Sequence, residues 1–101
     1  MPPRYTNEKH EAWIHGHPCA LTMFSCCGGG VEGHHLMRPW HGFRGMGYKA
    51  NDRNLIPLCR KHHRYLHDYG NEMKFFEKAT GRADFGKTTA QAFWMSSPHY
   101  E

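Results

Sequence analysis

The stretch LCRKHHRYLH, residues 58–67, places one cysteine and three histidines within ten positions. If this stretch is helical, His63 and His67 lie four positions apart and share one face, where two imidazoles can bind one metal ion. His62 lies about 100° around the helix from His63 and therefore faces a different site. The stretch predicts two metal sites on two faces of one helix.

The first site begins with Cys59 and His62, because Cys-x-x-His is a common half of a zinc site. Four cysteines in a chain without an apolar leader favour metal binding or free thiols over disulfides. Cys19 together with Cys26 or Cys27 would complete a tetrahedral structural zinc site. Cys27 is favoured because a glycine follows it and permits the turn. The alternative is that these cysteines are free thiols without a metal.

The second site needs a further ligand for His63 and His67, and the segment "GHHL" supplies two candidates. On a strand His34 and His35 point to opposite sides. One of them can bind the metal, while the other, with an ordinary pKa near 6.5, is suited to act as a general base. The alternative is that all four are ordinary surface or packed histidines.

The pattern along the chain predicts a small α+β protein with one domain over residues 1–101. A long loop rich in glycine and arginine separates the two expected strands, and helices flank them. The expected helices are 6–15, capped by Thr6 or Asn7, then 60–68, 71–80 and 84–95, and the expected strands are 31–37 and 54–58. A bound metal would add stability to so short a chain.

The formal net charge of +4 mildly favours a polyanionic partner. No apolar run is long enough to cross a membrane, and the first residues lack the apolar core of a signal peptide. These features predict a cytoplasmic protein.

The chain resembles HNH endonucleases, the ββα-metal or His-Me-finger superfamily, and small phage and prophage members most of all. The resemblance rests on His34-His35-Leu36, "GMGYKAND" (45–52), Asn54 and "PLCRKHH" (57–63), followed by His67. It covers about residues 17–70 and implies a ββα-metal core there. Outside the resemblance, the residue pattern predicts a helical C-terminal part at about 71–97. The resemblance also implies an origin in a phage or prophage and a place in the bacterial host cell.

The resemblance implies a role for each matching residue. His35 looks like the general base, and Asn54 looks like the residue that orients the His35 ring through its side chain or its backbone. His34, His63 and His67 look like ligands of one catalytic metal. Three imidazoles favour zinc, nickel or cobalt, whereas family members also work with magnesium or manganese.

The loop from 38 to 53 is where DNA is expected to lie. Arg38, Arg44 and Lys49 are the expected phosphate contacts. The alternative is a solvated basic loop whose aromatic residues pack on the core.

These observations predict a metal-dependent DNA endonuclease or nickase. The first alternative is a zinc-stabilised nucleic-acid-binding module without cleavage activity. The second is a metal-binding structural protein of a phage without a nucleic-acid partner. DNA is the expected partner, and a second copy of the chain or a phage recombination protein is compatible with the sequence.

Overall fold

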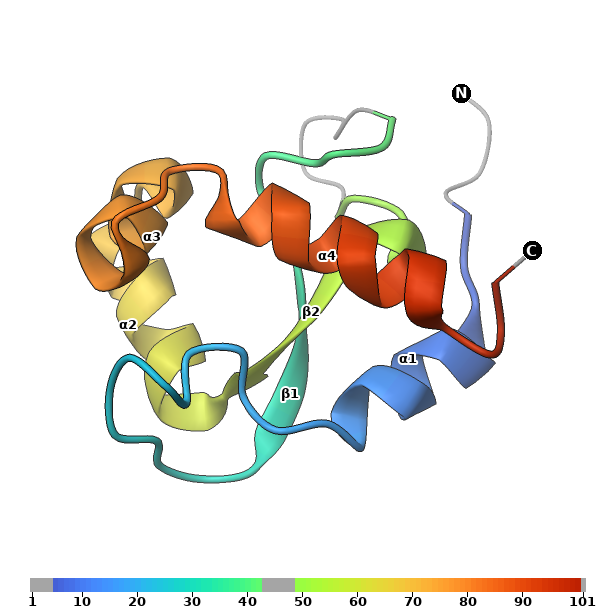
Figure 1. The fold of residues 1–101 in the computed structure, drawn as a ribbon, viewed down its shortest axis with the longest axis horizontal. Helices are drawn as coiled ribbons and strands as arrows, with labels where there is room; N and C mark the ends of the chain where they lie inside the picture. The colour runs from blue at the N-terminus through green and yellow to red at the C-terminus, as the bar shows by residue number, and fades with distance from the viewer. Residues whose placement is uncertain (1–4, 43–48, 101) are drawn as a thin grey trace.

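In the part of the chain that the structure describes, two short antiparallel strands form the centre of the domain and four α-helices surround them (Figure 1). The computed structural model describes residues 5–42 and 49–100. The elements are α1 (Glu8–His15), β1 (Val31–His35), the 3-10 turn η1 (Asp52–Asn54), β2 (Leu55–Cys59), α2 (Arg60–Tyr69), α3 (Glu72–Thr80) and α4 (Phe85–Ser96). The predicted α+β class is confirmed, and each predicted helix and strand is present with ends shifted by one or two residues at most positions.

The two strands pair in a single register, in which Val31 faces Cys59 and His35 faces Leu55. Pro57 fits within β2 because its carbonyl accepts a hydrogen bond from Ala20 N–H at 2.8 Å, on the side away from β1. The N–H and C=O of one strand residue point to the same side, so the missing N–H of Pro57 removes no bond to β1.

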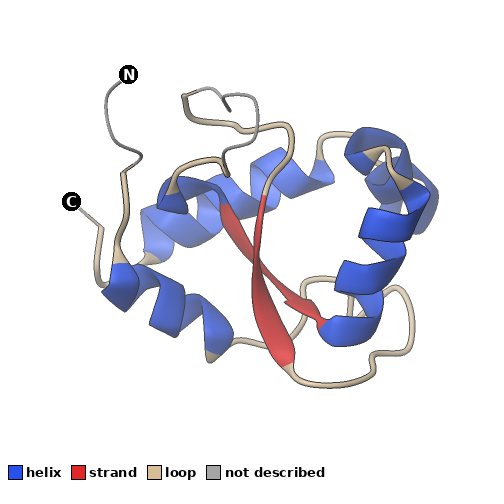
Figure 2. Ribbon diagram, turned by 180° about the vertical axis from the view of Figure 1, so that it is seen from behind, coloured by secondary structure: helices blue, strands red, loops and turns tan. Residues whose placement is uncertain are grey.

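The helices lie on different sides of the strand pair. Figure 1 shows α2 and α3 at one end of the domain, α1 at the other, and α4 crossing the upper end of the strand pair between them. In the opposite view the segment between α1 and β1 loops past the first turn of α2 (Figure 2). The two described ends of the chain lie close together, and the Asn7 side chain donates a hydrogen bond to the His99 carbonyl at 3.0 Å.

The helix ends follow from local chemistry. Asn7 caps α1 by accepting a hydrogen bond from His10 N–H, and Asn71 caps α3 in the same way through Lys74 N–H. Gly70 and Gly81 end α2 and α3 with φ values of 82° and 85°, which only glycine adopts readily. Polar caps at the start of α1 and α3 and glycines at the end of α2 and α3 therefore fix the bounds of these helices.

The core lies between the strand pair and helices α2 to α4. Its buried members are Cys19, Leu21, Leu36, Ile56, Leu58, Cys59, Leu66, Phe76 and Ala90. Two of these members are cysteines of the predicted zinc site, so metal ligation and core packing share residues. Among the described residues, no helix is both long and apolar enough to cross a membrane.

A buried histidine joins α1 to α4. His10 is fully buried, its Nδ1 lies 2.9 Å from Ser97 Oγ, and its ring packs edge-on against Trp94. Its Nε2 atom has no hydrogen-bond partner among the residues that the structure describes. Burial lowers the pKa of His10 to about 4, with Asp52 opposing the shift and His99 adding to it. His10 is therefore neutral at pH 7.

This burial predicts a pH dependence of stability. Because the pKa of His10 is lower in the folded than in the unfolded state, its contribution is fully present above pH 6.5 and is lost as the pH falls toward 4. Between pH 7 and pH 5 the wild type should lose about 2 kcal/mol more unfolding free energy than His10→Phe. Urea unfolding at both pH values measures the difference, and equal losses would contradict the assignment.

Candidate metal centres and candidate active site

Three cysteines and one histidine meet at the start of α2. The ligand atoms of Cys19, Cys27, Cys59 and His62 lie within 4.8 Å of one another. The distances from His62 Nδ1 to the three sulfur atoms are 3.5 Å, 3.8 Å and 3.1 Å for Cys19, Cys27 and Cys59. Tetrahedral zinc with ordinary bond lengths requires S···N separations of about 3.5 Å. The cluster therefore has the donor atoms and spacing that zinc needs.

The local sequence builds this cluster. Cys59 caps α2, with its sulfur accepting a hydrogen bond from His62 N–H, so both residues belong to one helix start. The carbonyls of Gly28 and Gly30 accept the next free N–H groups, those of Lys61 and Arg60. Gly29 between them has a φ of 79° and approaches the Arg60 side chain closely, so glycine is required there. These bonds hold Cys27 against the helix.

Protonation in this cluster suits a metal site. Burial raises the pKa of the Cys19 thiol to about 11. Burial acts in the same direction on Cys59, but hydrogen bonds from the backbone of Gly28 and His62 outweigh it and lower the pKa of that thiol. Burial lowers the pKa of His62, which keeps its imidazole neutral. Metal binding would release the proton of Cys19, so affinity should rise with pH.

Three histidines meet on the other face of α2. The ligand atoms of His34, His63 and His67 lie within 4.8 Å of one another. The Nε2 atoms of His63 and His67 are 3.1 Å apart. Ligands of one zinc ion are separated by about 3.3 Å when both are imidazole nitrogens. The structure thus brings together the three residues predicted for the second metal site, and it places Cys27, not Cys26, in the first.

Carboxylates determine which nitrogen each histidine offers. His34 Nε2–H donates to Glu72 Oε1 at 2.7 Å, and His63 Nδ1–H donates to Glu32 Oε1 at 2.8 Å. A carboxylate can only accept, so His34 presents the lone pair of Nδ1 and His63 that of Nε2. Burial lowers the pKa of His34 despite the neighbouring Glu72, which keeps its ring neutral. Both rings are thereby prepared as ligands.

Glu72 also holds the segment that follows β1. Its two oxygens accept the backbone N–H groups of Met37 and Arg38 at 3.1 Å and 2.9 Å. The Glu72 side chain is buried, so this one carboxylate connects α3, the ligand His34 and the start of the long loop.

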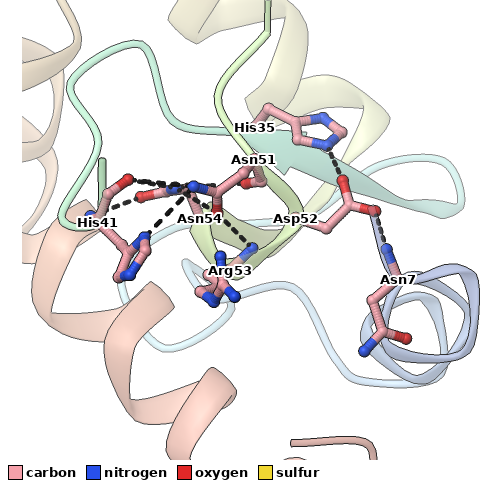
Figure 3. A network of polar contacts seen from close by, with 7 residues as sticks. All are labelled: Asn7, His35, His41, Asn51, Asp52, Arg53 and Asn54. Carbon is pink, nitrogen blue, oxygen red and sulfur yellow. Dashed lines mark hydrogen bonds and ion pairs between the residues drawn. The ribbon is translucent and has the colours of Figure 1, made fainter. Parts of the chain in front are cut away.

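His35 points to the opposite face of β1 from His34. Its Nε2–H donates to Asp52 Oδ1 at 2.8 Å (Figure 3). A carboxylate oxygen of Glu11 in α1 lies within 4.8 Å of the same group of atoms. The His35 side chain retains 9% of its exposure. The predicted division of the histidine pair between two faces is present in the structure.

Asn54 does not have the contacts predicted for it. Its Oδ1 accepts the N–H groups of Trp40 and His41 at 2.8 Å and 3.2 Å, and its Nδ2 donates to His41 and Asn51 (Figure 3). The ring of His35 is held by the Asp52 side chain instead. The Asn54 side chain therefore holds the start of the long loop, because it bonds the backbone N–H groups of Trp40 and His41 and the His41 carbonyl.

Two of the three predicted phosphate contacts can be located. Arg38 and Lys49 are exposed, at the two ends of the loop. Arg44 lies outside the described residues. Trp40 packs against the core and its Nε1–H donates to the Arg53 carbonyl at 2.7 Å, so it is a packing residue.

A cavity of about 620 Å³ lies beside the cysteine cluster and not beside the three histidines. Its walls come from α2, α3 and the segment before Cys26 and include Phe24, Tyr65, Tyr69 and Phe75. His34, His63 and His67 are not among the described residues that line this cavity.

Three carboxylates at the site were not predicted from the sequence. Asp52 lies within the quoted "GMGYKAND" segment, and Glu32 is two positions before His34 and so shares its strand face. The local sequence could therefore have predicted Asp52 and Glu32 as site residues. It could not have predicted Glu72, which reaches His34 only through the packing of α3.

The fold and its clusters define a small α+β domain with two antiparallel strands, four helices and a Cys/His cluster that could bind a metal such as zinc. The chain belongs to a family described as "Protein of unknown function (DUF968)", whose model matches residues 2–92. It is similar to "Uncharacterized protein YdfU" of Escherichia coli (strain K12), with 38% identity over 89 residues. The match covers 79% of this chain but 24% of that relative, so the chain spans about a quarter of the relative's length. No solved structure matches the chain.

The cysteine cluster predicts different effects for two adjacent cysteines. Cys27→Ser should lower zinc affinity at least about a hundredfold, which corresponds to about 2.7 kcal/mol of folded-state stability when free zinc is well above both dissociation constants. Cys26→Ser is the matched control and should leave zinc content unchanged, since Cys26 is outside the cluster. Competition with a chelator measures both. Equal zinc affinities for the two variants would contradict the ligand set.

The carboxylate contacts predict that Glu72 controls metal binding without touching the ion. Glu72→Gln should lower the affinity of the histidine cluster 10- to 100-fold, because the amide no longer fixes the His34 ring. Isothermal titration with Zn²⁺ or Ni²⁺ measures it. Glu77→Gln, on the exposed side of α3, is the control. An unchanged affinity in Glu72→Gln would contradict the role.

Proposed function

We propose that the chain is a metal-dependent DNA endonuclease or nickase with an HNH (ββα-metal) core. The observation that carries the proposal is the division of adjacent histidines on β1. His34 joins His63 and His67 as a candidate metal ligand, whereas His35 is held by a carboxylate on the other face. Three candidate metal ligands and an imidazole oriented by a carboxylate are the groups that metal-dependent hydrolysis of a phosphodiester uses.

In this proposal the cysteine cluster has a structural role. Four protein ligands, from Cys19, Cys27, Cys59 and His62, leave no position for substrate on a tetrahedral zinc ion. The cluster would connect the segment before β1 to the start of α2. The histidine cluster has three protein ligands, which is typical of a catalytic site with an open position.

The chemistry of the proposed reaction follows from the side chains. His35 takes a proton from water on the nitrogen that does not donate to Asp52, and the water oxygen bonds to phosphorus. The bond from phosphorus to the 3′ oxygen breaks, and the leaving 3′ oxygen takes up a proton from solvent. The products are a 5′-phosphate and a 3′-hydroxyl. A divalent ion held by His34, His63 and His67 would supply stabilisation of the negative charge on the phosphate and the leaving oxygen. Mg²⁺, Mn²⁺, Zn²⁺ and Ni²⁺ are the candidates.

The charge of the loop supports DNA as the substrate. Arg38 and Lys49 are exposed at its two ends, close in sequence to His35 and to Asp52. Phosphate contacts of this kind position DNA without reading its sequence. A second copy of the chain or a recombination protein of a phage host would be compatible partners, in a bacterial cytoplasm.

A second candidate is a zinc-stabilised module that binds nucleic acid without cleaving it. Two observations on His35 favour this second candidate. Its side chain retains 9% of its exposure. Its bond to Asp52 also connects β1 to the turn before β2. In that case His35 would be a packing residue and its loss would affect stability rather than activity.

Cleavage of supercoiled plasmid by the wild type and by His35→Ala distinguishes the two candidates. Each protein is incubated with EDTA and with each of the four ions. The proposal predicts nicking that requires a metal and falls at least about 100-fold in His35→Ala, while metal content and folding persist. His15→Ala, at the exposed end of α1, is the control histidine. Binding without nicking under every ion would favour the second candidate.

A further inference from the structure

The buried carboxylate of Asp52 lies between the proposed general base and the start of α1. We propose that Asp52 is a positioning residue that fixes the tautomer and the orientation of His35, an inference that rests on the proposed role of His35. The sequence predicted that Asn54 would orient the His35 ring, but the Asn54 side chain accepts from the N–H groups of Trp40 and His41 instead. A carboxylate side chain in that place makes a stronger acceptor than an amide or a backbone carbonyl.

Asp52 is itself held firmly by three bonds. Its Oδ1 accepts from His35 Nε2 and its Oδ2 accepts from Asn7 N–H, both at 2.8 Å (Figure 3). Its own N–H donates to the Tyr5 carbonyl at 3.1 Å. The side chain retains 6% of its exposure, so water competes little for these oxygens. The imidazole is therefore held against a fixed group rather than a mobile one.

The chemistry of the contact determines the tautomer. An ionised carboxylate can only accept, so Nε2 of His35 carries the proton and Nδ1 carries the lone pair. Nδ1 is then the atom that takes the proton from water. When it does, the positive charge of the imidazolium forms beside the negative charge of Asp52, which stabilises it in a site of low exposure.

Together with Glu11, His35 and Asp52 form a group that could instead bind a metal ion. A carboxylate oxygen of Glu11, a ring nitrogen of His35 and a carboxylate oxygen of Asp52 lie within 4.8 Å of one another, as metal ligands would. The 2.8 Å separation of His35 Nε2 from Asp52 Oδ1 is a hydrogen-bond length and is shorter than the spacing of about 3.3 Å between ligands of one tetrahedral ion. The geometry thus favours a direct hydrogen bond between His35 and Asp52 over metal ligation. The number of metal equivalents bound by Asp52→Asn and by the wild type tests this assignment.

The substitution Asp52→Asn separates positioning from packing. The new amide can still accept from Asn7 N–H through its oxygen, but its NH₂ group would donate to His35 and move the proton of the ring to Nδ1. We expect kcat to fall about 10²- to 10⁴-fold with KM changed by less than about threefold. In ¹⁵N-histidine NMR spectra of the zinc-loaded protein, the protonated nitrogen of His35 should change from Nε2 to Nδ1.

Gly81→Ala is the control for a purely structural effect. Gly81 has a φ of 85° at the end of α3 and lies outside the His35 network, so alanine there should cost about 1–2 kcal/mol of stability. That variant should retain the wild-type kcat below its unfolding temperature and the wild-type tautomer. Any loss of kcat in Asp52→Asn beyond that of Gly81→Ala then reports on the position of His35.

Two results would overturn the inference. One is a wild-type kcat and tautomer in Asp52→Asn, and the other is the loss of one bound metal equivalent from that variant, which would make the cluster with Glu11 a metal site. An inactive wild type would instead contradict the proposed function. The NMR spectra would still decide whether Asp52 sets the tautomer, so the two failures are distinguishable.

Discussion

The register of the β1–β2 pair is the constraint on which the candidate sites depend. With His35 opposite Leu55, His34 faces α2 and His35 faces Asp52. Because side chains alternate along a strand, a slip of one residue would exchange the two histidines and place the wrong ring beside His63. The register is secured at one end by the start of α2, where Gly30 accepts the Arg60 N–H, and at the other by the bond from Leu36 N–H to the Asn54 carbonyl.

Three carboxylate–imidazole hydrogen bonds orient the histidine side chains that this register places. They join Glu72 to His34, Glu32 to His63 and Asp52 to His35, at distances between 2.7 Å and 2.8 Å. Each pair fixes a proton on one ring nitrogen. In our proposal the other nitrogen of His34 and of His63 binds a metal ion, and that of His35 takes a proton from water. The carboxylates come from α3, β1 and η1, so the candidate site requires most of the fold to be formed.

Much of this arrangement could be predicted from the sequence, because local signals carried it. Helix caps and terminal glycines predicted the helices. The spacing of His63 and His67 predicted that both lie on one face of α2, and the glycine after Cys27 favoured Cys27 over Cys26 as a ligand. The partners of the histidines depend on contacts between distant segments. Glu72 is 38 positions from His34, and the amide of Asn54 holds residues 13 and 14 positions away, so neither role has a local pattern.

In our proposal α2 carries two separate metal centres, one on each of two faces. A crystal structure of zinc-loaded protein with anomalous data at the zinc edge tests it most directly. We expect two peaks per chain, one among Cys19, Cys27, Cys59 and His62 and one among His34, His63 and His67. A single peak, or cysteines joined in a disulfide with no metal between them, would contradict the account.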